Sequence, residues 1–277
     1  MTARAASTSP SPLATTPAFL RASRAIGRAA ITYGLPFGTF LLLWELWSDA
    51  FGVPQLFPSP RATAHTYWQI VADGTLPFDA LTSITRIVIG FVIGSVLGAL
   101  GGLVIGTFRL AREVLEPWVN FLRFISGVAW ISIFIVWFGI GETPKVALIA
   151  FATIFPVYLN LYSGIRSVDL RLLDAAKSFG LSRADQIWHV VLPSALPSLL
   201  VGLRYALSVS ILVLVVAEQI NASAGLGYLI NNARDFMRTD IIVVCLMVYA
   251  ILGLGADWLV RAIEARALIW RPSIVEQ

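Results

Sequence analysis

Cysteine is almost absent from this chain of 277 residues, in which Cys245 is the single example. One cysteine excludes a disulfide framework and a cysteine-based metal site. Its place in an apolar run is typical of a small apolar filler. Histidine is nearly as rare, and neither His65 nor His189 has metal-ligand spacing with another histidine or a carboxylate. The sequence therefore predicts no metal site.

Charge is also scarce. Only 13% of the residues are Asp, Glu, Lys or Arg, well below the roughly 25% of soluble domains. In contrast, 57% are hydrophobic, and the nine tryptophans favour membrane–water interfaces. This composition excludes a soluble globular domain and predicts an all-α polytopic protein of the lipid bilayer.

Catalytic patterns are missing as well. The sequence has no paired carboxylates for acid–base chemistry, no nucleophile–base constellation and no nucleic-acid-binding pattern. Its two lysines, Lys145 and Lys177, do not follow a glycine, so no G-x-x-x-x-G-K-[ST] loop occurs. The chain is thus predicted to be no enzyme, to bind no cofactor and no nucleic acid, and to leave any ATP hydrolysis to another subunit.

Six apolar runs are long enough to cross a bilayer, which takes about twenty residues. They cover residues 30–50, 84–106, 117–138, 146–165, 199–220 and 240–261. No small-residue cleavage site ends the first run, which favours an uncleaved span. Residues 1–28 are predicted to be a disordered tail, residues 29–271 the transmembrane domain, and residues 272–277 a short C-terminal tail.

Positive charge decides the predicted orientation. With the N-terminus inside, the cytosolic segments hold most of the positively charged residues: Arg4, Arg21, Arg24, Arg28, Arg109, Arg112, Arg166, Arg171, Lys177, Arg183, Arg261, Arg266 and Arg271. The outer segments hold Arg61, Lys145, Arg234 and Arg238. The positive-inside rule therefore places both termini in the cytosol of a cytoplasmic (inner) membrane protein.

Glycine recurs every fourth residue in the second run, at Gly90, Gly94, Gly98, Gly102 and Gly106. At helical spacing these residues form one smooth stripe, which favours close packing of another helix. A glycine groove along a substrate path is the alternative. Before this run, Ser59 and Pro60 predict the start of a short outer helix over 61–72, Gly74 its end, and Thr82/Ser83 the start of the second span. On the same side of the membrane, residues 223–227 predict a flexible turn.

The longest cytosolic connection, residues 166–198, is polar. Leu172, Leu173, Ala176 and Phe179 predict a short amphipathic helix that Gly180 ends. Ser182 is predicted to cap a second helix, which Leu192-Pro193 closes. A surface-lying connector without a partner is one interpretation of this segment.

The same segment resembles the signature of permease subunits of binding-protein-dependent ABC importers. That signature is Glu-Ala-Ala, three residues, Gly, nine residues, then Ile-x-Leu-Pro. The chain has Asp174-Ala175-Ala176, then Gly180, then Val190-Val191-Leu192-Pro193 at the same spacing, with Asp for Glu and Val for Ile. The resemblance extends over most of residues 56–271.

Several segments resemble the nitrate/sulfonate/taurine branch, whose members import alkanesulfonates, taurine, nitrate, bicarbonate or pyrimidine precursors. They are residues 56–60, 83–90, 137–141, 155–160, 217–220 and 225–230. Residues 221–227 followed by 235–240 are most similar to aliphatic sulfonate members. The chain departs from its relatives in the third span, where Ser126-Gly127 and Ser132 replace prolines.

The resemblance implies a six-helix, type I (MetI-like) permease fold with a cytosolic coupling helix. It also implies a homodimer, two ABC ATPase subunits that hold ATP and Mg, and an extracytoplasmic solute-binding protein. The expected function is ATP-driven import of a small anionic solute, with an aliphatic sulfonate or taurine favoured. Nitrate, bicarbonate or a thiamine-pyrimidine-type substrate is the alternative within the class, and an ATP-independent carrier or channel the alternative outside it. The ATPase would dock on Asp174, Ala175, Ala176, Gly180, Val190, Leu192 and Pro193.

Polar groups inside membrane spans are costly and are candidates for function. Arg86 and Glu218 lie near the predicted outer ends of the second and fifth spans, and Asn221 follows. They either are solvated or pair with each other, or they belong to the pathway, the outer gate or the surface that receives the binding protein. Arg123 and Arg204, near cytosolic span ends, are expected to reach the lipid headgroups.

Overall fold

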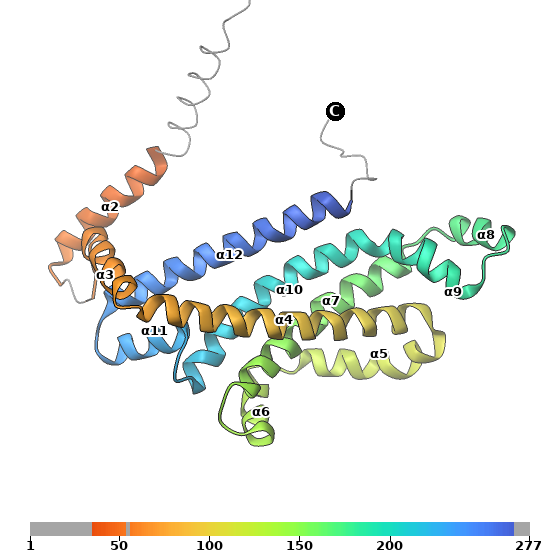
Figure 1. Ribbon diagram of the computed structural model, residues 1–277, viewed down its shortest axis with the longest axis horizontal. Coiled ribbons are helices and arrows are strands. Elements are labelled where there is room, and N and C mark those ends of the chain that lie inside the picture. Colours follow the sequence, from red (N-terminus) through yellow and green to blue (C-terminus); the bar gives the residue numbers. More distant parts are fainter. Residues whose placement is uncertain (1–34, 54–55, 269–277) are drawn as a thin grey trace, which may run out of the picture. The chain divides into compact units, whose positions relative to one another are not determined.

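The computed structural model describes residues 35–53 and 56–268 (Figure 1). All regular elements in these ranges are helical, and no strand occurs among them, which confirms the predicted all-α class. Both predicted tails, residues 1–28 and 272–277, lie outside the described residues. The chain divides into two units with a boundary between Pro60 and Arg61.

The first unit contains α2 (Leu35–Phe51), the described part of the predicted first span. Two of its side chains hold the segment that follows the helix. The Ser48 hydroxyl donates to the carbonyl of Phe57 at 2.7 Å, and the Trp44 indole donates to the carbonyl of Pro58 at 3.0 Å. These bonds satisfy backbone carbonyls that have no helical partner.

The second unit is built on four helices that are long and apolar enough to cross a membrane. They are α4 (Thr75–Thr107), α7 (Thr143–Arg166), α10 (Leu192–Asn221) and α12 (Thr239–Ala267). In the second unit α7 packs against both α4 and α10, and α12 packs on α10 (Figure 1). These helices contain the predicted second, fourth, fifth and sixth spans.

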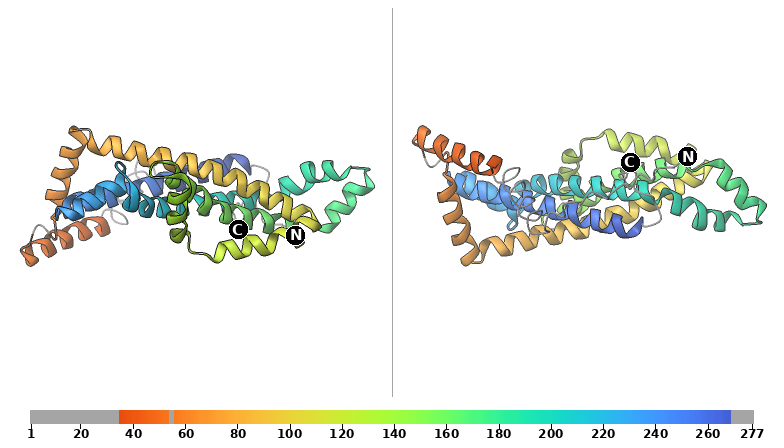
Figure 2. Two further views of the ribbon diagram at one scale, coloured as in Figure 1. Left: turned by 90° about the horizontal axis from the view of Figure 1, so that it is seen from below. Right: turned by 90° about the horizontal axis from the view of Figure 1, so that it is seen from above.

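Short helices lie at the two ends of this bundle. Helix α11 (Leu226–Asp235) lies at one end, called here the α11 end, and packs on α12 and α10. Helices α8 (Leu170–Ser178) and α9 (Arg183–Gln186) lie together at the opposite end, called the α8 end (Figures 1 and 2). Helix α3 (Pro60–Ala72) begins at Pro60 as predicted.

The predicted start of the second span is wrong by about two turns. Gly74 does interrupt the chain, with a φ of 82°, but α4 begins at the next residue, Thr75, and not at Thr82/Ser83. Leu76, Phe78 and Leu81 continue the apolar pattern through this segment. Ser83 is therefore an interior residue of α4, and it is fully buried.

The predicted third span, 117–138, is not one continuous helix. It divides into α5 (Arg109–Phe124), the 3-10 turn η2 (Gly127–Ala129) and α6 (Trp130–Phe138). Ile125 is extended and ends α5, and Ser126 has no helical structure before η2 begins at Gly127. Helix α5 carries five charged residues, of which Arg123 lies within the predicted span, so the helix that contains the first part of this span is amphipathic rather than apolar throughout.

The glycine stripe of α4 faces α7, and all five of its glycines are buried. A Cβ at Gly94 would lie 2.3 Å from the carbonyl oxygen of Ala150, and one at Gly98 would lie 2.6 Å from that of Ile154. The two backbones thus approach too closely for any side chain at these positions. This contact holds α4 and α7 together as the centre of the second unit.

Candidate functional site

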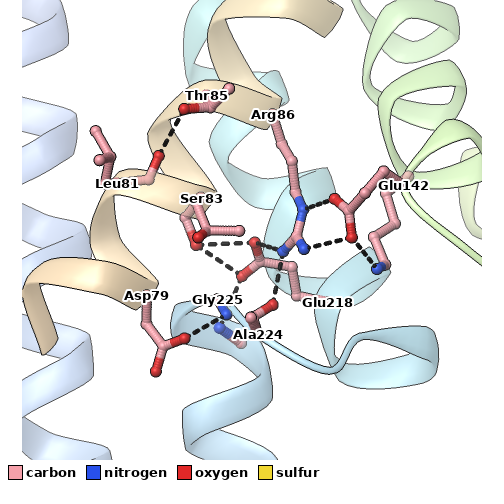
Figure 3. Close-up of polar contacts among 12 residues, drawn as sticks. Asp79, Leu81, Ser83, Thr85, Arg86, Glu142, Glu218, Ala224 and Gly225 are labelled. Atoms are coloured by element: carbon pink, nitrogen blue, oxygen red, sulfur yellow. Dashed lines mark hydrogen bonds and ion pairs between the residues drawn. The ribbon is translucent and has the colours of Figure 1, made fainter. Parts of the chain in front are cut away.

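A buried network of polar side chains occupies the α11 end of the bundle (Figure 3). Its members come from α4, from the start of α7, and from α10 and the loop that follows it. We call this set the α11-end network; it comprises Asp79, Ser83, Arg86, Glu142, Lys145 and Glu218. Apart from Glu142, all are buried.

Arg86 is the hub of the network. Its Nη1 donates to Glu218 Oε1 at 2.6 Å and to the carbonyl of Ala224 at 2.7 Å. Its Nε and Nη2 donate to the two carboxylate oxygens of Glu142, the second at 2.7 Å. One guanidinium from α4 therefore connects the start of α7, the end of α10 and the α10–α11 loop, in the fork geometry that arginine offers to carboxylates.

Glu218 is only 1% exposed and accepts from several donors. Besides Arg86, the Ser83 hydroxyl donates to it at 2.8 Å, and the Tyr249 hydroxyl at 3.3 Å. A buried carboxylate remains charged only when such partners replace its water. Of the two interpretations of Arg86 and Glu218, pairing with each other is therefore the arrangement found, and both are shielded from solvent.

The start of α11 is fixed by the same side chains. Three successive backbone N–H groups, of Gly225, Leu226 and Gly227, donate to Asp79 Oδ1, Ser83 Oγ and Glu218 Oε2 at 2.7 to 2.9 Å. N–H groups at a helix start have no partner within the helix, and carboxylates there are favoured by the helix dipole. The loop over 223–227, predicted to be a flexible turn, is thus held in place by side chains from α4 and α10. The local sequence gives no sign of these contacts.

Glycine is needed in this loop for two reasons. Gly225 has a φ of 114°, which other residues rarely adopt. A Cβ on Gly227 would lie 2.6 Å from the Cβ of Glu218. Both glycines therefore let the backbone approach the buried carboxylate.

Glu142 is the solvent-facing member of the network, with 57% of its side chain exposed. It lies immediately before α7 and also accepts from Lys145 Nζ at 2.9 Å. Hydrogen bonds from the Arg86 guanidinium, aided by Lys145, lower the pKa of Glu142 to about 2. Lys145 itself is only 2% exposed.

Sequence reasoning selected two members of this network and missed four. Asp79, Ser83, Glu142 and Lys145 were given no role, because their convergence depends on contacts between positions up to 146 residues apart. The available signal was Arg86 itself, because an arginine within a membrane span needs polar or charged partners. Asn221, the third candidate for the pathway or gate, is the last residue of α10, and its side chain lies outside what the structure describes.

At the α8 end, Asp174, Ala175 and Ala176 lie in α8 and Gly180 in the turn after it, whereas the other motif residues lie beyond α9. Asp169 caps α8 by accepting from the backbone N–H of Arg171 at 2.9 Å. Leu181 N donates to Ala176 O and Gly180 N to Lys177 O, while Gly180 has a φ of 78°. This is a Schellman ending, so the prediction that Gly180 ends the helix is confirmed. Ser182 then caps α9, also as predicted.

The surface around this turn is apolar and exposed. Ala176 is buried and Leu173 packs inward, but Phe179 is 84% exposed and Trp188 is 66% exposed. Asp174 is exposed and pairs with Lys177 at 3.0 Å. Large aromatic side chains in water are costly, so this patch is a candidate surface for a partner.

The prediction that Leu192-Pro193 closes the second helix is wrong. Helix α9, a π turn over Ile187–Val191, and α10 follow one another without a break. Within the π turn, the N–H of Leu192 donates to the carbonyl of Ile187, five residues earlier. A proline ring clashes with the carbonyl four residues before it in a regular helix, and the wider π turn relieves that clash. Val190 thus lies in the π turn, and Leu192 and Pro193 are the first two residues of the membrane-length helix α10.

Arg204 does not simply extend to the membrane surface as predicted. Its Nε lies 2.6 Å from Asp257 Oδ1, and Asp257 Oδ2 accepts from Arg261 at 2.7 Å. An ion pair between α10 and α12 thus replaces a free charge. Asp257, in the predicted sixth span, was not considered from the sequence. Arg123, in contrast, is exposed at the end of α5 and lies over the ring of Phe124.

Residues 90–269 match the sequence model of a family described as the binding-protein-dependent transport system inner membrane component. The chain belongs to this family. The matched range includes α7, α8, α10 and α12 and the whole polar connection over residues 166–198. The predicted recognition as an ABC importer permease is therefore confirmed.

Curated relatives of this permease are similar over most of their length. A protein of Escherichia coli K12 named as an aliphatic sulfonates transport permease, SsuC, is 40% identical over 240 residues, covering 86% of this chain and 91% of that protein. The protein of the same name from Bacillus subtilis 168 is 36% identical over 218 residues, or 79% of each chain. The taurine transport system permease protein TauC of Escherichia coli K12 is 32% identical over 249 residues, covering 87% and 90%.

Two solved structures share the permease fold. A chain of the inward-facing MetNI methionine ABC transporter aligns with a TM-score of 0.54 at 18% identity, over 65% of this chain and 92% of that one. A chain of an amino acid ABC transporter crystallised with histidines aligns with a TM-score of 0.55 at 19% identity, over 68% and 92%. The likeness confirms the predicted MetI-like fold; four of the six predicted spans correspond to membrane-length helices in the described residues.

Proposed function

We propose that this permease imports a small organic anion, with an aliphatic sulfonate or taurine favoured, and that a separate ATPase drives it through the α8 end. The relatives named above support the substrate class, because both names refer to sulfonates. In this proposal two copies of the permease form the pathway. Two ATPase subunits hold ATP and Mg, and an extracytoplasmic solute-binding protein delivers the solute.

The single observation that carries the coupling role is the exposed turn between α8 and α9. Its backbone is fixed by a Schellman ending and by two caps, while its aromatic side chains face solvent. A rigid turn with an exposed apolar surface can transmit force from a partner, whereas a disordered loop cannot. Because the π turn continues α9 directly into α10, a push on this turn would move a membrane-length helix.

The proposed orientation follows the distribution of positive charge. It places the α8 end and both termini in the cytosol, and the α11 end on the outer side of the inner membrane. The coupling surface then faces the compartment that holds ATP. The α11-end network, including Arg86 and Glu218, is proposed to belong to the outer gate, since it ties together the ends of three long helices.

Reconstitution tests this function. The permease, its cognate ATPase and the binding protein are placed in proteoliposomes, and uptake of radiolabelled taurine and of short alkanesulfonates is measured with and without ATP. Uptake that needs both ATP and the ATPase supports the proposal. Uptake that persists without either would identify a secondary carrier or channel instead. Retention of nitrate or a neutral pyrimidine by the binding protein would refute the sulfonate assignment alone.

A further inference from the structure

Glu142 differs from every other member of the α11-end network in being exposed. Two cations, Arg86 at 3% exposure and Lys145 at 2%, share its carboxylate, yet the carboxylate itself faces solvent. Glu218 is the opposite case, because it is buried and held by four donor groups. Of the two carboxylates on Arg86, that of Glu142 can leave while Arg86 and Ser83 stay bonded to Glu218.

The backbone around Glu142 leaves room for such a movement. The loop before it, residues 139–141, joins α6 to α7, and Gly139 has a φ of 78°. No other atom lies within 4 Å of where a Cβ would stand on Gly139 or Gly141. The loop immediately before Glu142 is therefore not closely packed at these two glycines.

A cavity opens beside the shared carboxylate. Its volume is about 410 Å³, within the range of small-molecule sites. Arg86, Glu142, Thr82 and Thr85 line one part of it, and Phe78, Leu81, Ile89, Val146 and Ala224 line the rest. Lys145 does not line the cavity itself but reaches the Glu142 carboxylate at 2.9 Å. The cavity thus combines an apolar wall with a polar end at which the Glu142 carboxylate pairs with two cations.

We propose that a small organic anion with an aliphatic tail displaces the Glu142 carboxylate from Arg86 and Lys145 and binds in this cavity. The anionic head takes the position of the carboxylate between the two cations, and the tail lies against Phe78, Leu81, Ile89 and Val146. The inference rests on the proposed function only for the identity of the anion as a transported sulfonate. The Glu142 carboxylate then competes with the anion and occupies the anion's position when no ligand is bound.

Physical chemistry explains why only an anion can do this. Leaving a buried cation without a partner is strongly unfavourable, so a neutral ligand cannot compensate for the loss of Glu142. A sulfonate, in contrast, offers three oxygens to the guanidinium fork and the ammonium group. With a pKa of about 2, Glu142 remains charged at neutral pH, so protonation does not release it.

The proposal is tested by measuring binding to the full-length permease in a neutral detergent. Butanesulfonate is the probe, and butanol, which has the aliphatic tail but no anionic group, is the control ligand. Glu142→Gln removes the competing charge at nearly constant volume. It is expected to bind butanesulfonate about tenfold more tightly than the unchanged protein, a difference of about 1.4 kcal/mol. Lys145→Met is expected to weaken that binding in either background, and butanol is expected not to bind.

Glu113→Gln is the matched control. Glu113 has 58% of its side chain exposed and pairs with Arg109, an arginine that is itself 88% exposed, so the chemical change is the same but no buried cation is involved. Equal affinities of unchanged and Glu142→Gln protein would overturn the proposal. If Glu142→Gln fails to fold, the Lys145→Met variant tests the proposal by itself, because an unchanged affinity for butanesulfonate in that variant also excludes the site.

Lipid headgroups carry the same chemistry, so nanodiscs distinguish the source of the anion. Butanesulfonate affinity is measured in phosphatidylcholine discs with and without phosphatidylglycerol. Little dependence on phosphatidylglycerol supports a solute site, and full competition would reassign it to lipid. If the permease takes up sulfonate but these variants do not change binding, the site is refuted and the transport proposal stands. If Glu142→Gln binds more tightly but the unchanged permease shows no uptake, the transport proposal is refuted and the site stands.

Discussion

Arg86 and Glu218, 132 positions apart in the sequence, form a buried ion pair in which Nη1 lies 2.6 Å from Oε1. The pair joins α4 to α10 and, through Ala224 and Gly227, to the start of α11. The pair thus explains how the loop between α10 and α11, predicted from the sequence to be flexible, is held in place at the α11 end of the bundle.

Removing one partner of this pair is expected to destabilise the protein strongly. In Glu218→Gln, Arg86 keeps Glu142 but loses its buried counter-charge, which costs about 3–5 kcal/mol in comparable pairs. Thermal unfolding in detergent measures the effect. Glu113→Gln, in an exposed pair, is expected to change stability by less than about 0.5 kcal/mol. Equal melting temperatures for the two variants would contradict a structural role of the buried pair.

The glycine stripe of α4 predicts a sharp positional effect. Gly94→Val would place its Cβ 2.3 Å from a backbone oxygen of α7, so about 3 kcal/mol or more of stability should be lost, or folding should fail. Gly101→Ala serves as the control, because the nearest atom to its added Cβ lies at 3.9 Å. That control should be neutral or slightly stabilising, since alanine favours helices by roughly 0.5–1 kcal/mol. Membrane yield and melting temperature measure both.

The turn at Gly180 predicts a separation of folding from transport. Gly180→Glu is expected to abolish uptake and ATPase association while the permease stays in the membrane, because residues other than glycine rarely adopt a φ of 78° and a glutamate would project from the proposed docking turn. Gly180→Asn is the control, since asparagine tolerates this conformation. It should retain most ATPase association. Normal association and transport in Gly180→Glu would exclude docking at this turn.

The contribution of Glu142 to stability should depend on pH in one direction. Its folded pKa is lowered to about 2 from an ordinary value of 4.5. The ionised carboxylate therefore stabilises the fold fully above pH 4.5, and this stabilisation is lost as pH falls from 4.5 towards 2. The difference in melting temperature between unchanged protein and Glu142→Gln should be constant from pH 7 to 5 and shrink below. Growth of the difference on acidification would contradict the pairing.

Local signals in the sequence predicted those features that local forces determine. Gly74 and Gly180 mark chain interruptions because both need a positive φ, and Ser182 caps its helix through its own side chain. The apolar runs of α4, α7, α10 and α12 are found because burial in lipid needs no particular partner.

Features that depend on distant contacts were missed. Nothing near Asp79 or Lys145 indicates that Arg86 lies beside them, since these residues meet only after α4, α7 and α10 have packed. Pro193 reads as a stop signal because the π turn that accommodates it has no clear local signature. The third span was misread because its apolar content suggested continuity, while Ser126-Gly127 allows the chain to break between α5 and α6.

Uptake of radiolabelled alkanesulfonate by proteoliposomes tests the central claim most directly. The liposomes contain the permease and its ATPase, the binding protein is outside, and ATP is inside. Accumulation that requires ATP, and that Gly180→Glu abolishes but Gly180→Asn retains, is the predicted result. Accumulation at the same rate without ATP, or with Gly180→Glu, would contradict the account of an ATPase-driven permease coupled through the α8 end.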